Sequence, residues 1–319
     1  MRAIVLHEFG PPENLRYEEI DDPEPGAGQV RIAVASAGVH LVDTIIRRGV
    51  DHGPYPQPQL PAVPGREVAG VVDAVGPDVG DEWLGRRVVA HLGAASAGYA
   101  ELAVREVDAL HTLPDGLADD AAVAMIGTGR TTMAILDVAQ ITPEDVVLVT
   151  AAAGGIGSLL VQAARAAGAR VIGAARGTGK VQHVRELGAD RAVDYAAPGW
   201  EDEVGEVTVL LDGVGGELGR SAFERLAPGG RAIVFGGASG GPIQFDVWDL
   251  YRRGLTVSAA IGARPRTMRA LEERALAAAA DGSLVPAVER FPLAEAAAAH
   301  AAIEARATIG KVVLVPERT

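Results

Sequence analysis

The residues best suited to chemistry form a glycine-rich turn at 150–157. The sequence TAAAGGIG follows an apolar run at 146–150 and precedes a stretch with helical periodicity at 158–167. Glycines let a backbone approach a pyrophosphate closely, and the N–H groups at a helix N-terminus favour its negative charge. A second apolar run follows at 170–174, as in dinucleotide-binding units. The sequence predicts a dinucleotide site at Ala153, Gly154, Gly155, Ile156 and Gly157, the alternative being a tight turn without a ligand.

The residues after the second run distinguish between the two coenzymes. A site for NAD places a carboxylate near the end of the second strand, where it binds the ribose 2′-hydroxyl. This chain has Arg176 there and Lys180 four residues later. Cations suit a 2′-phosphate, which a carboxylate would repel. We therefore expect NADPH, with Tyr195 near the adenosine ribose; the alternative is that both cations are solvated charges at a helix start.

Two further predicted strands end in glycine. The fourth ends in DGVGG at 212–216 and the fifth in FGGASG at 235–240. In a doubly wound sheet, ligands bind at the carboxyl ends of the strands where the strand order reverses. Glycines there would let the flat nicotinamide and its ribose approach the backbone, although glycines also simply form turns. These segments add four residues to the predicted site: Val214, Phe235, Gly236 and Gly237.

Two kinds of segment are expected to position these residues. Residues 1 to 115 contain short β-rich runs separated by proline and glycine, which favours a small barrel or sandwich. After residue 117 strands and helices alternate, and six predicted strands joined by helices indicate a doubly wound α/β architecture. Helices are expected at 121–139, 158–167, 181–187, 218–226, 267–280 and 293–305.

Composition excludes several classes of function. The chain has 319 residues, which suggests two domains, and a formal net charge of −13, which disfavours binding to nucleic acid through overall charge. It has no cysteine, so it can form neither a disulfide, a thiolate nucleophile nor a Cys-ligated zinc site. No run approaches the roughly 20 apolar residues of a membrane span. With no secretory signal in the sequence, we expect a cytoplasmic location.

Several segments together resemble a known family. They are AGVHLVDTIIRRG at 37–49, PGREVAGVVDAVG at 64–76, TAAAGGIG at 150–157 and GKVVLVP at 310–316. The chain resembles the medium-chain dehydrogenase/reductase superfamily, most closely its zinc-independent quinone oxidoreductase branch. The resemblance implies an α/β fold with a GroES-like β-barrel catalytic domain at 1–119 and 266–319 and a Rossmann NADPH-binding domain at 120–265. It also implies a homodimer.

The resemblance carries over to individual residues. It places Thr131 near the nicotinamide and assigns Lys311 and Asp43 to the cofactor site, Asp43 as an orienting residue. His40 stands where zinc-dependent relatives have a cysteine, and Arg66 where they have a histidine. Catalytic zinc needs about three protein ligands, so no metal is expected. Quinone reductases usually have asparagine at the position of His40, a departure that bears on the substrate.

Without a metal ion, reduction of a conjugated acceptor is the favoured reaction, because the negative charge delocalises onto a quinone or enone oxygen. A donor near that oxygen would help, and His40, Tyr55 and Arg130 are the candidates. The leading interpretation is an NADPH-dependent quinone reductase. The alternatives are a reductase of 2-alkenals, enones or enoyl thioesters, and a non-catalytic NADPH-binding protein of crystallin-like or RNA-binding type.

Overall fold

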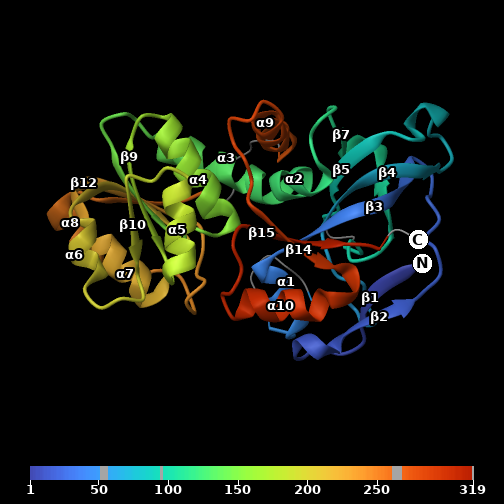
Figure 1. The fold of residues 1–319 in the computed structure, drawn as a ribbon, viewed down its shortest axis with the longest axis horizontal. Helices are drawn as coiled ribbons and strands as arrows, with labels where there is room; N and C mark the ends of the chain where they lie inside the picture. The colour runs from blue at the N-terminus through green and yellow to red at the C-terminus, as the bar shows by residue number, and fades with distance from the viewer. Residues whose placement is uncertain (51–56, 94–95, 261–267, 318–319) are drawn as a thin grey trace. The chain divides into compact units, whose positions relative to one another are not determined.

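The computed structural model describes residues 1–50, 57–93, 96–260 and 268–317 (Figure 1). Its backbone divides into two compact units. The first unit combines Met1–Gly127 with Pro286–Thr319, and the second is Thr128–Val285. Each unit is built around a sheet of its own.

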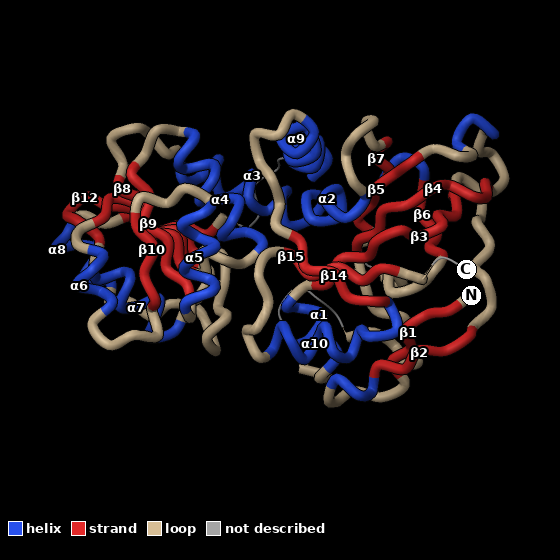
Figure 2. Tube along the Cα trace, viewed as in Figure 1, coloured by secondary structure: helices blue, strands red, loops and turns tan. Residues whose placement is uncertain are grey.

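A seven-stranded sheet organises the first unit (Figure 2). Its strand β3 (Gln29–Val39) pairs antiparallel with β4 (Glu67–Val75), with β6 (Leu102–Glu106) and with β15 (Lys311–Val315). Alternate residues of β3 are buried along most of its length, as expected for a strand with one face in the core. The other strands of the unit are β5 (Arg87–His91), β7 (Leu110–Thr112) and β14 (Val288–Pro292) in this sheet, and the separate antiparallel pair β1 (Arg2–Leu6) and β2 (Leu15–Glu19).

Short helices complete the first unit. α10 (Ala296–Glu304) buries Ala296, Ala299 and Ile303, whose spacing of three and four residues places them on one face of the helix against the core. The other α-helices are α1 (Leu41–Arg47) and α2 (Asp119–Ala124). Single 3₁₀ turns lie at η1 (Pro12–Asn14), η2 (Asp81–Trp83), η3 (Val107–Ala109) and η5 (Leu293–Glu295).

The second unit contains a parallel sheet with the strand order β10-β9-β8-β11-β12-β13. Along β8 (Val146–Thr150), Val147 and Val149 join one hydrophobic cluster while Leu148 joins the cluster on the other face. A parallel strand covered on both faces reads as a continuous apolar run, which is the VVLV pattern of this segment. The other strands are β9 (Arg170–Ala175), β10 (Arg191–Asp194), β11 (Val207–Asp212), β12 (Leu226–Val234) and β13 (Thr256–Ala259).

The helices of the second unit connect these strands on both faces of the sheet (Figure 1). They are α3 (Arg130–Ala139), α4 (Gly155–Ala166), α5 (Thr178–Glu186), α6 (Trp200–Val204), α7 (Gly216–Glu224), α8 (Val247–Arg253) and α9 (Met268–Ala280). The predicted doubly wound α/β architecture is thus confirmed. No helix in the described ranges is both long and apolar enough to cross a membrane.

Some local predictions differ from the structure. The expected helix at 121–139 is divided into α2 and α3 by the π-helical turn η4 (Met125–Gly129), whose sequence MIGTG contains two glycines that weaken a regular helix. α9 belongs to the second unit, whereas the sequence analysis placed the residues after 265 in the first domain. It packs on α3, where Arg274 pairs with Asp137 at 2.9 Å. The elements β2, β7, α1, α6 and α8 were not predicted from the sequence.

Candidate functional site

The glycine turn in the second unit leads from β8 into α4. Gly154 precedes the helix, which begins at Gly155, three residues earlier than expected from the sequence. A Cβ atom on Gly157 would lie 2.3 Å from the carbonyl oxygen of Ala151, so no side chain fits there. This close packing holds the positive end of α4 against the carboxyl end of β8, with Ala153 and Ile156 in the same turn. A glycine turn at a helix N-terminus is typical of pyrophosphate sites.

A buried carboxylate holds the neighbouring strand end. Asp212, at the end of β11, accepts a hydrogen bond from the Thr150 hydroxyl at 2.7 Å. It also accepts from the backbone N–H groups of Val214 and Gly215, both at 3.1 Å. Burial raises the pKa of Asp212 above its usual value, while these hydrogen bonds oppose that shift. Neither Asp212 nor Thr150 is predicted as a site residue from the sequence, because only the pairing of β11 with β8 makes them neighbours.

The end of β12 lies beside that turn. A Cβ atom on Gly213 would lie 2.6 Å from the Phe235 ring, and one on Gly236 would lie 2.4 Å from the carbonyl oxygen of Gly213. Gly237 packs in the same way against the backbone of Gly241. Val214, Phe235, Gly236 and Gly237 therefore lie together at the carboxyl edge of β11 and β12. The close backbone packing there requires glycine at positions 213, 236 and 237.

The residues predicted to bind the 2′-phosphate lie at the carboxyl ends of β9 and β10. Arg176 directly follows β9 and is exposed, and Gly177, with φ of +83°, turns the chain into α5, which carries Lys180. The backbone N–H of Tyr195 donates to Ala175 at 3.1 Å, which brings Tyr195 to the same edge of the sheet. Two cations at this edge give it the charge that a phosphate would require.

On α3, Arg130 and Thr131 have different surroundings. The Arg130 guanidinium contacts the Glu272 carboxylate of α9 at 2.9 Å. Thr131 is the next residue on α3 and is half-buried. Tyr55, the third candidate proton donor, lies outside the described residues.

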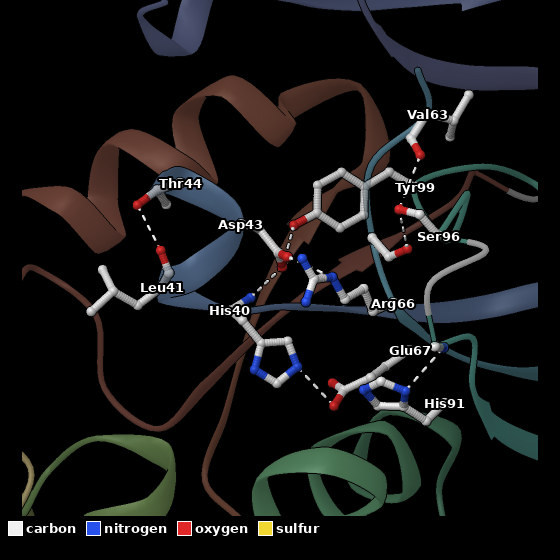
Figure 3. A network of polar contacts seen from close by, with 12 residues as sticks. His40, Leu41, Asp43, Thr44, Val63, Arg66, Glu67, His91, Ser96 and Tyr99 are labelled. Carbon is white, nitrogen blue, oxygen red and sulfur yellow. Dashed lines mark hydrogen bonds and ion pairs between the residues drawn. The ribbon is translucent and has the colours of Figure 1, made fainter. Parts of the chain in front are cut away.

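A compact ionic cluster lies in the first unit, where β4 and β15 both pair with β3 (Figure 3). The Nε2 atom of His40 lies 2.7 Å from Oε1 of Glu67. The Nζ atom of Lys311 lies 2.8 Å from Oε2 of Glu67 and 2.9 Å from Nε2 of His40. His40 directly precedes α1, Glu67 begins β4 and Lys311 begins β15. Sheet pairing thus brings three ionisable groups from distant parts of the chain into mutual contact.

Glu67 is completely buried in this cluster. Burial alone would raise its pKa, but the adjacent His40 and Lys311 charges outweigh burial and hold the pKa far below its usual range. Two glycines provide the space, because a Cβ atom on Gly38 would lie 2.3 Å from Oε2 of Glu67 and one on Gly127 only 1.6 Å from Oε1. The carboxylate is therefore ionised and rigidly enclosed, with one wall formed by His40.

A second network fixes the backbone that carries His40 (Figure 3). Asp43 accepts a hydrogen bond from the backbone N–H of His40 at 2.8 Å and from the Tyr99 hydroxyl at 3.2 Å. The Tyr99 hydroxyl also contacts Nε2 of His300 at 3.1 Å, and Arg66 lies 3.8 Å from Asp43. Burial lowers the pKa of His300 to about 4 and raises that of Tyr99. Asp43 thus orients the start of α1.

The family of the chain follows from comparison with known proteins. The model for the alcohol dehydrogenase GroES-like domain matches residues 26–115, and that for zinc-binding dehydrogenases matches residues 155–277. A 2-haloacrylate reductase from a Burkholderia species is 34% identical over 99% of both chains, and a quinone oxidoreductase from Pseudomonas aeruginosa is 33% identical over 99% of both. The chain belongs to the quinone oxidoreductase branch of the medium-chain dehydrogenase/reductase superfamily.

Solved structures agree with this family and confirm the expected pairing of a GroES-like domain with a Rossmann domain. The Escherichia coli quinone oxidoreductase complexed with NADPH superimposes with a TM-score of 0.85, at 29% identity, over 99% of this chain and 100% of that chain. A protein described as an NAD-dependent alcohol dehydrogenase superimposes with a TM-score of 0.88, at 31% identity, over 99% of both chains. The chain is therefore an oxidoreductase of this family.

The zinc ion that the second family model implies does not fit the residues of this cluster. His40 and Glu67 could each donate a ligand atom, but the Lys311 ammonium lies within 3 Å of both and would repel a cation. Arg66, the neighbour of Glu67, offers only guanidinium nitrogens, which do not bind metal. Within the described ranges, no group of three or more His, Asp or Glu side chains could hold a metal ion.

Proposed function

We propose that the chain is a zinc-independent oxidoreductase that uses NADPH to reduce a quinone. The observation that carries this proposal is the pairing of a closely packed glycine turn before α4 with Arg176 at the end of β9, where an NAD site would have a carboxylate. The E. coli relative that binds NADPH shares the fold over its whole length, and several relatives are quinone oxidoreductases.

Each group of residues would have a distinct task. The turn at Gly154–Gly157 would hold the pyrophosphate, and Arg176 and Lys180 would hold the 2′-phosphate with Tyr195 beside the ribose. Bound NADPH supplies the hydride. Backbone at Val214 and Gly236 would flank the nicotinamide, and Thr131 stays a predicted neighbour of that ring.

His40 is the proton donor that we favour for the reduced acceptor. Its side chain is 25% exposed, and its Nδ1 points away from Glu67 (Figure 3). Because Nε2 faces Glu67 and Lys311, we assign the contact with the developing oxyanion to Nδ1. Arg130 is a weaker candidate because its guanidinium already binds Glu272. In this arrangement the Lys311 ammonium pairs with the Glu67 carboxylate. The contact with the cofactor that was predicted for Lys311 would require the ammonium to leave Glu67.

A second acceptor class is favoured by one of the relatives. The 2-haloacrylate reductase that is 34% identical acts, by its name, on an activated alkene. Hydride addition to a quinone and to an enone both leave a negative charge that is delocalised onto oxygen. The same residues could therefore serve a 2-alkenal, an enone or an enoyl thioester.

A panel of acceptors tests the proposal. NADPH oxidation is followed with 1,4-benzoquinone, 1,4-naphthoquinone, 2-hexenal and crotonyl-CoA, each at matched concentrations. We expect the largest kcat/KM with a quinone. A kcat/KM for an enal or thioester at least tenfold above those for both quinones would contradict the quinone assignment and favour the second class. No turnover with any acceptor, together with tight NADPH binding, would indicate a non-catalytic protein.

We further propose that the enzyme is a cytoplasmic homodimer. The edge strand β13 follows α8, whose Trp248 and Tyr251 are 62% and 80% exposed. An unpaired edge with exposed aromatic side chains nearby is suited to pairing with a second copy. Light scattering after size-exclusion chromatography is expected to give twice the chain mass for the unmodified protein. The Trp248→Glu variant is expected to give the mass of one chain. A monomeric unmodified protein would refute the dimer.

A further inference from the structure

A cavity in the first unit lies apart from the ionic cluster. It has a volume of about 630 Å³, within the usual range for sites that bind small molecules. Its walls come from the segment before η1, from α1 and from the end of α10, which lies beside α1 (Figure 1). The residues that matter below are Arg47, Arg48, Arg306, Glu304, Pro12 and Leu41.

The charge of this cavity is opposite to that of the whole chain. The chain carries a formal net charge of −13, yet three arginines line the cavity against one carboxylate, Glu304. Glu304 binds Arg47 through a short contact to Nη2, and it also lies 3.6 Å from Nε of Arg48. A second acid, Glu13, acts on Arg47 only as a nearby charge. One carboxylate cannot satisfy both Arg47 and Arg48, because each guanidinium group has five N–H donors.

Arg47 shows the imbalance most clearly. Its side chain is 1% exposed, and among the described residues its Nε and Nη1 atoms have no hydrogen-bond partner. Burial lowers the pKa of Arg47 in spite of the opposing effect of Glu304. A buried guanidinium nitrogen without an acceptor is costly, and an oxyanion that displaced part of the wall beside Arg47 would bring an acceptor to it.

We propose that this cavity binds a small organic anion, a carboxylate or phosphate ester with a short apolar body. Guanidinium groups bind both kinds of oxyanion in a bidentate manner. Pro12 and Leu41 provide an apolar wall for the body of the ligand, and the cavity is larger than a bare phosphate ion needs. The site is independent of the proposed redox chemistry.

Isothermal titration of the full chain tests this site with three probes: phenyl phosphate, benzoate and inorganic phosphate. The protein carries Arg176→Ala and Lys180→Ala, so that the predicted 2′-phosphate site does not contribute. We expect one molecule of phenyl phosphate or benzoate to bind per chain, and the preferred probe identifies the oxyanion. Inorganic phosphate is expected to bind at least tenfold more weakly, because it lacks the apolar body. Failure of both organic probes to saturate below 10 mM, or equal binding of inorganic phosphate, would overturn the proposal.

Variants with opposite expected effects locate the binding. Arg48→Gln removes one cation from a half-exposed position and is expected to weaken binding about tenfold or more. Glu304→Gln removes the competing carboxylate and is expected to tighten it. Arg170→Gln, an exposed arginine on β9, is the control and should change nothing. If Glu304→Gln lowers the yield of folded protein, Arg306→Gln is used in its place and is expected to weaken binding of the anion. Binding that is unaffected by Arg48→Gln would refute the site.

Discussion

At the scale of single residues, the contacts of His40 are unusual because one ring nitrogen faces two groups of opposite kind. Nε2 lies within 3 Å of the Glu67 carboxylate, which only accepts, and of the Lys311 ammonium, which only donates. A proton on Nε2 satisfies Glu67, whereas an unprotonated Nε2 accepts from Lys311. The cluster therefore engages Nε2 and leaves Nδ1 as the nitrogen that we assign to the acceptor.

His40→Ala is expected to lower kcat/KM for NADPH and 1,4-benzoquinone by about 10²-fold, the lower range for loss of an acid–base catalyst. NADPH binding, followed by fluorescence, should stay unchanged. His40→Asn introduces the residue usual in quinone reductases and tests whether hydrogen bonding alone suffices. An unchanged kcat/KM for His40→Ala would remove His40 from the mechanism.

Glu67 and Lys311 are expected to be strongly coupled. Glu67→Gln leaves the buried Lys311 ammonium without its carboxylate, and Lys311→Met leaves Glu67 with His40 alone. Each variant should lower the free energy of unfolding by about 3–5 kcal/mol. The double variant restores charge balance and should be less destabilised than the sum of the two. Urea unfolding of the four proteins measures this coupling, and additive losses would show that the pair does not act as a unit.

The buried His300 predicts a loss of stability in acid. Its pKa is about 4 in the folded chain because of burial, below the ordinary value of 6.5. The unfolded chain therefore binds a proton first as the pH falls, and stability decreases between pH 6.5 and 4 by up to about 3 kcal/mol. Urea unfolding at pH 7 and 4.5 should show this decrease, and His300→Gln should reduce it. An equal loss of stability between pH 7 and 4.5 in the unmodified chain and in His300→Gln would contradict the assignment of this loss to His300.

Single residues can be predicted from the sequence where a local motif marks them. The glycines at 154–157 and the cations Arg176 and Lys180 follow directly from strand and turn order. Glu67 received no role because its partners lie 27 residues before it and 244 residues after it, and only the pairing of β3 with β4 and β15 brings them together. Such long-range contacts leave no periodic signal in one sequence.

At the scale of elements, the turn between β8 and α4 carries the cofactor proposal. Gly157→Ala is expected to push α4 away from β8, because its Cβ would lie 2.3 Å from the Ala151 carbonyl oxygen. We expect a loss of stability of about 1–3 kcal/mol and weaker NADPH binding. Gly179→Ala on α5, where a Cβ meets nothing within 4 Å, is the stability control. A Gly157→Ala protein as stable as this control would argue against the close packing.

Regular elements were easier to predict than interruptions. β8 is a continuous apolar run and β15 begins within a recognisable motif, so both were located closely. The helix expected at 121–139 has suitable residues throughout, yet it is interrupted at Met125–Gly129. The π-helical turn depends on packing around its glycines, which helix propensity alone does not reveal.

At the scale of the whole molecule, the account depends on the coenzyme. The acidic chain concentrates Arg176 and Lys180 at one edge of its parallel sheet, where the extra phosphate of NADPH would lie. The net charge of −13 would otherwise repel a polyanion, so these cations must supply the attraction locally.

The most direct test is kcat/KM for NADPH and NADH with 1,4-benzoquinone, measured for the unmodified chain and for Arg176→Ala. We expect the unmodified chain to prefer NADPH by at least tenfold, and Arg176→Ala to lose most of that preference by weakening NADPH alone. A preference for NADH, or a preference for NADPH that Arg176→Ala leaves intact, would contradict the account.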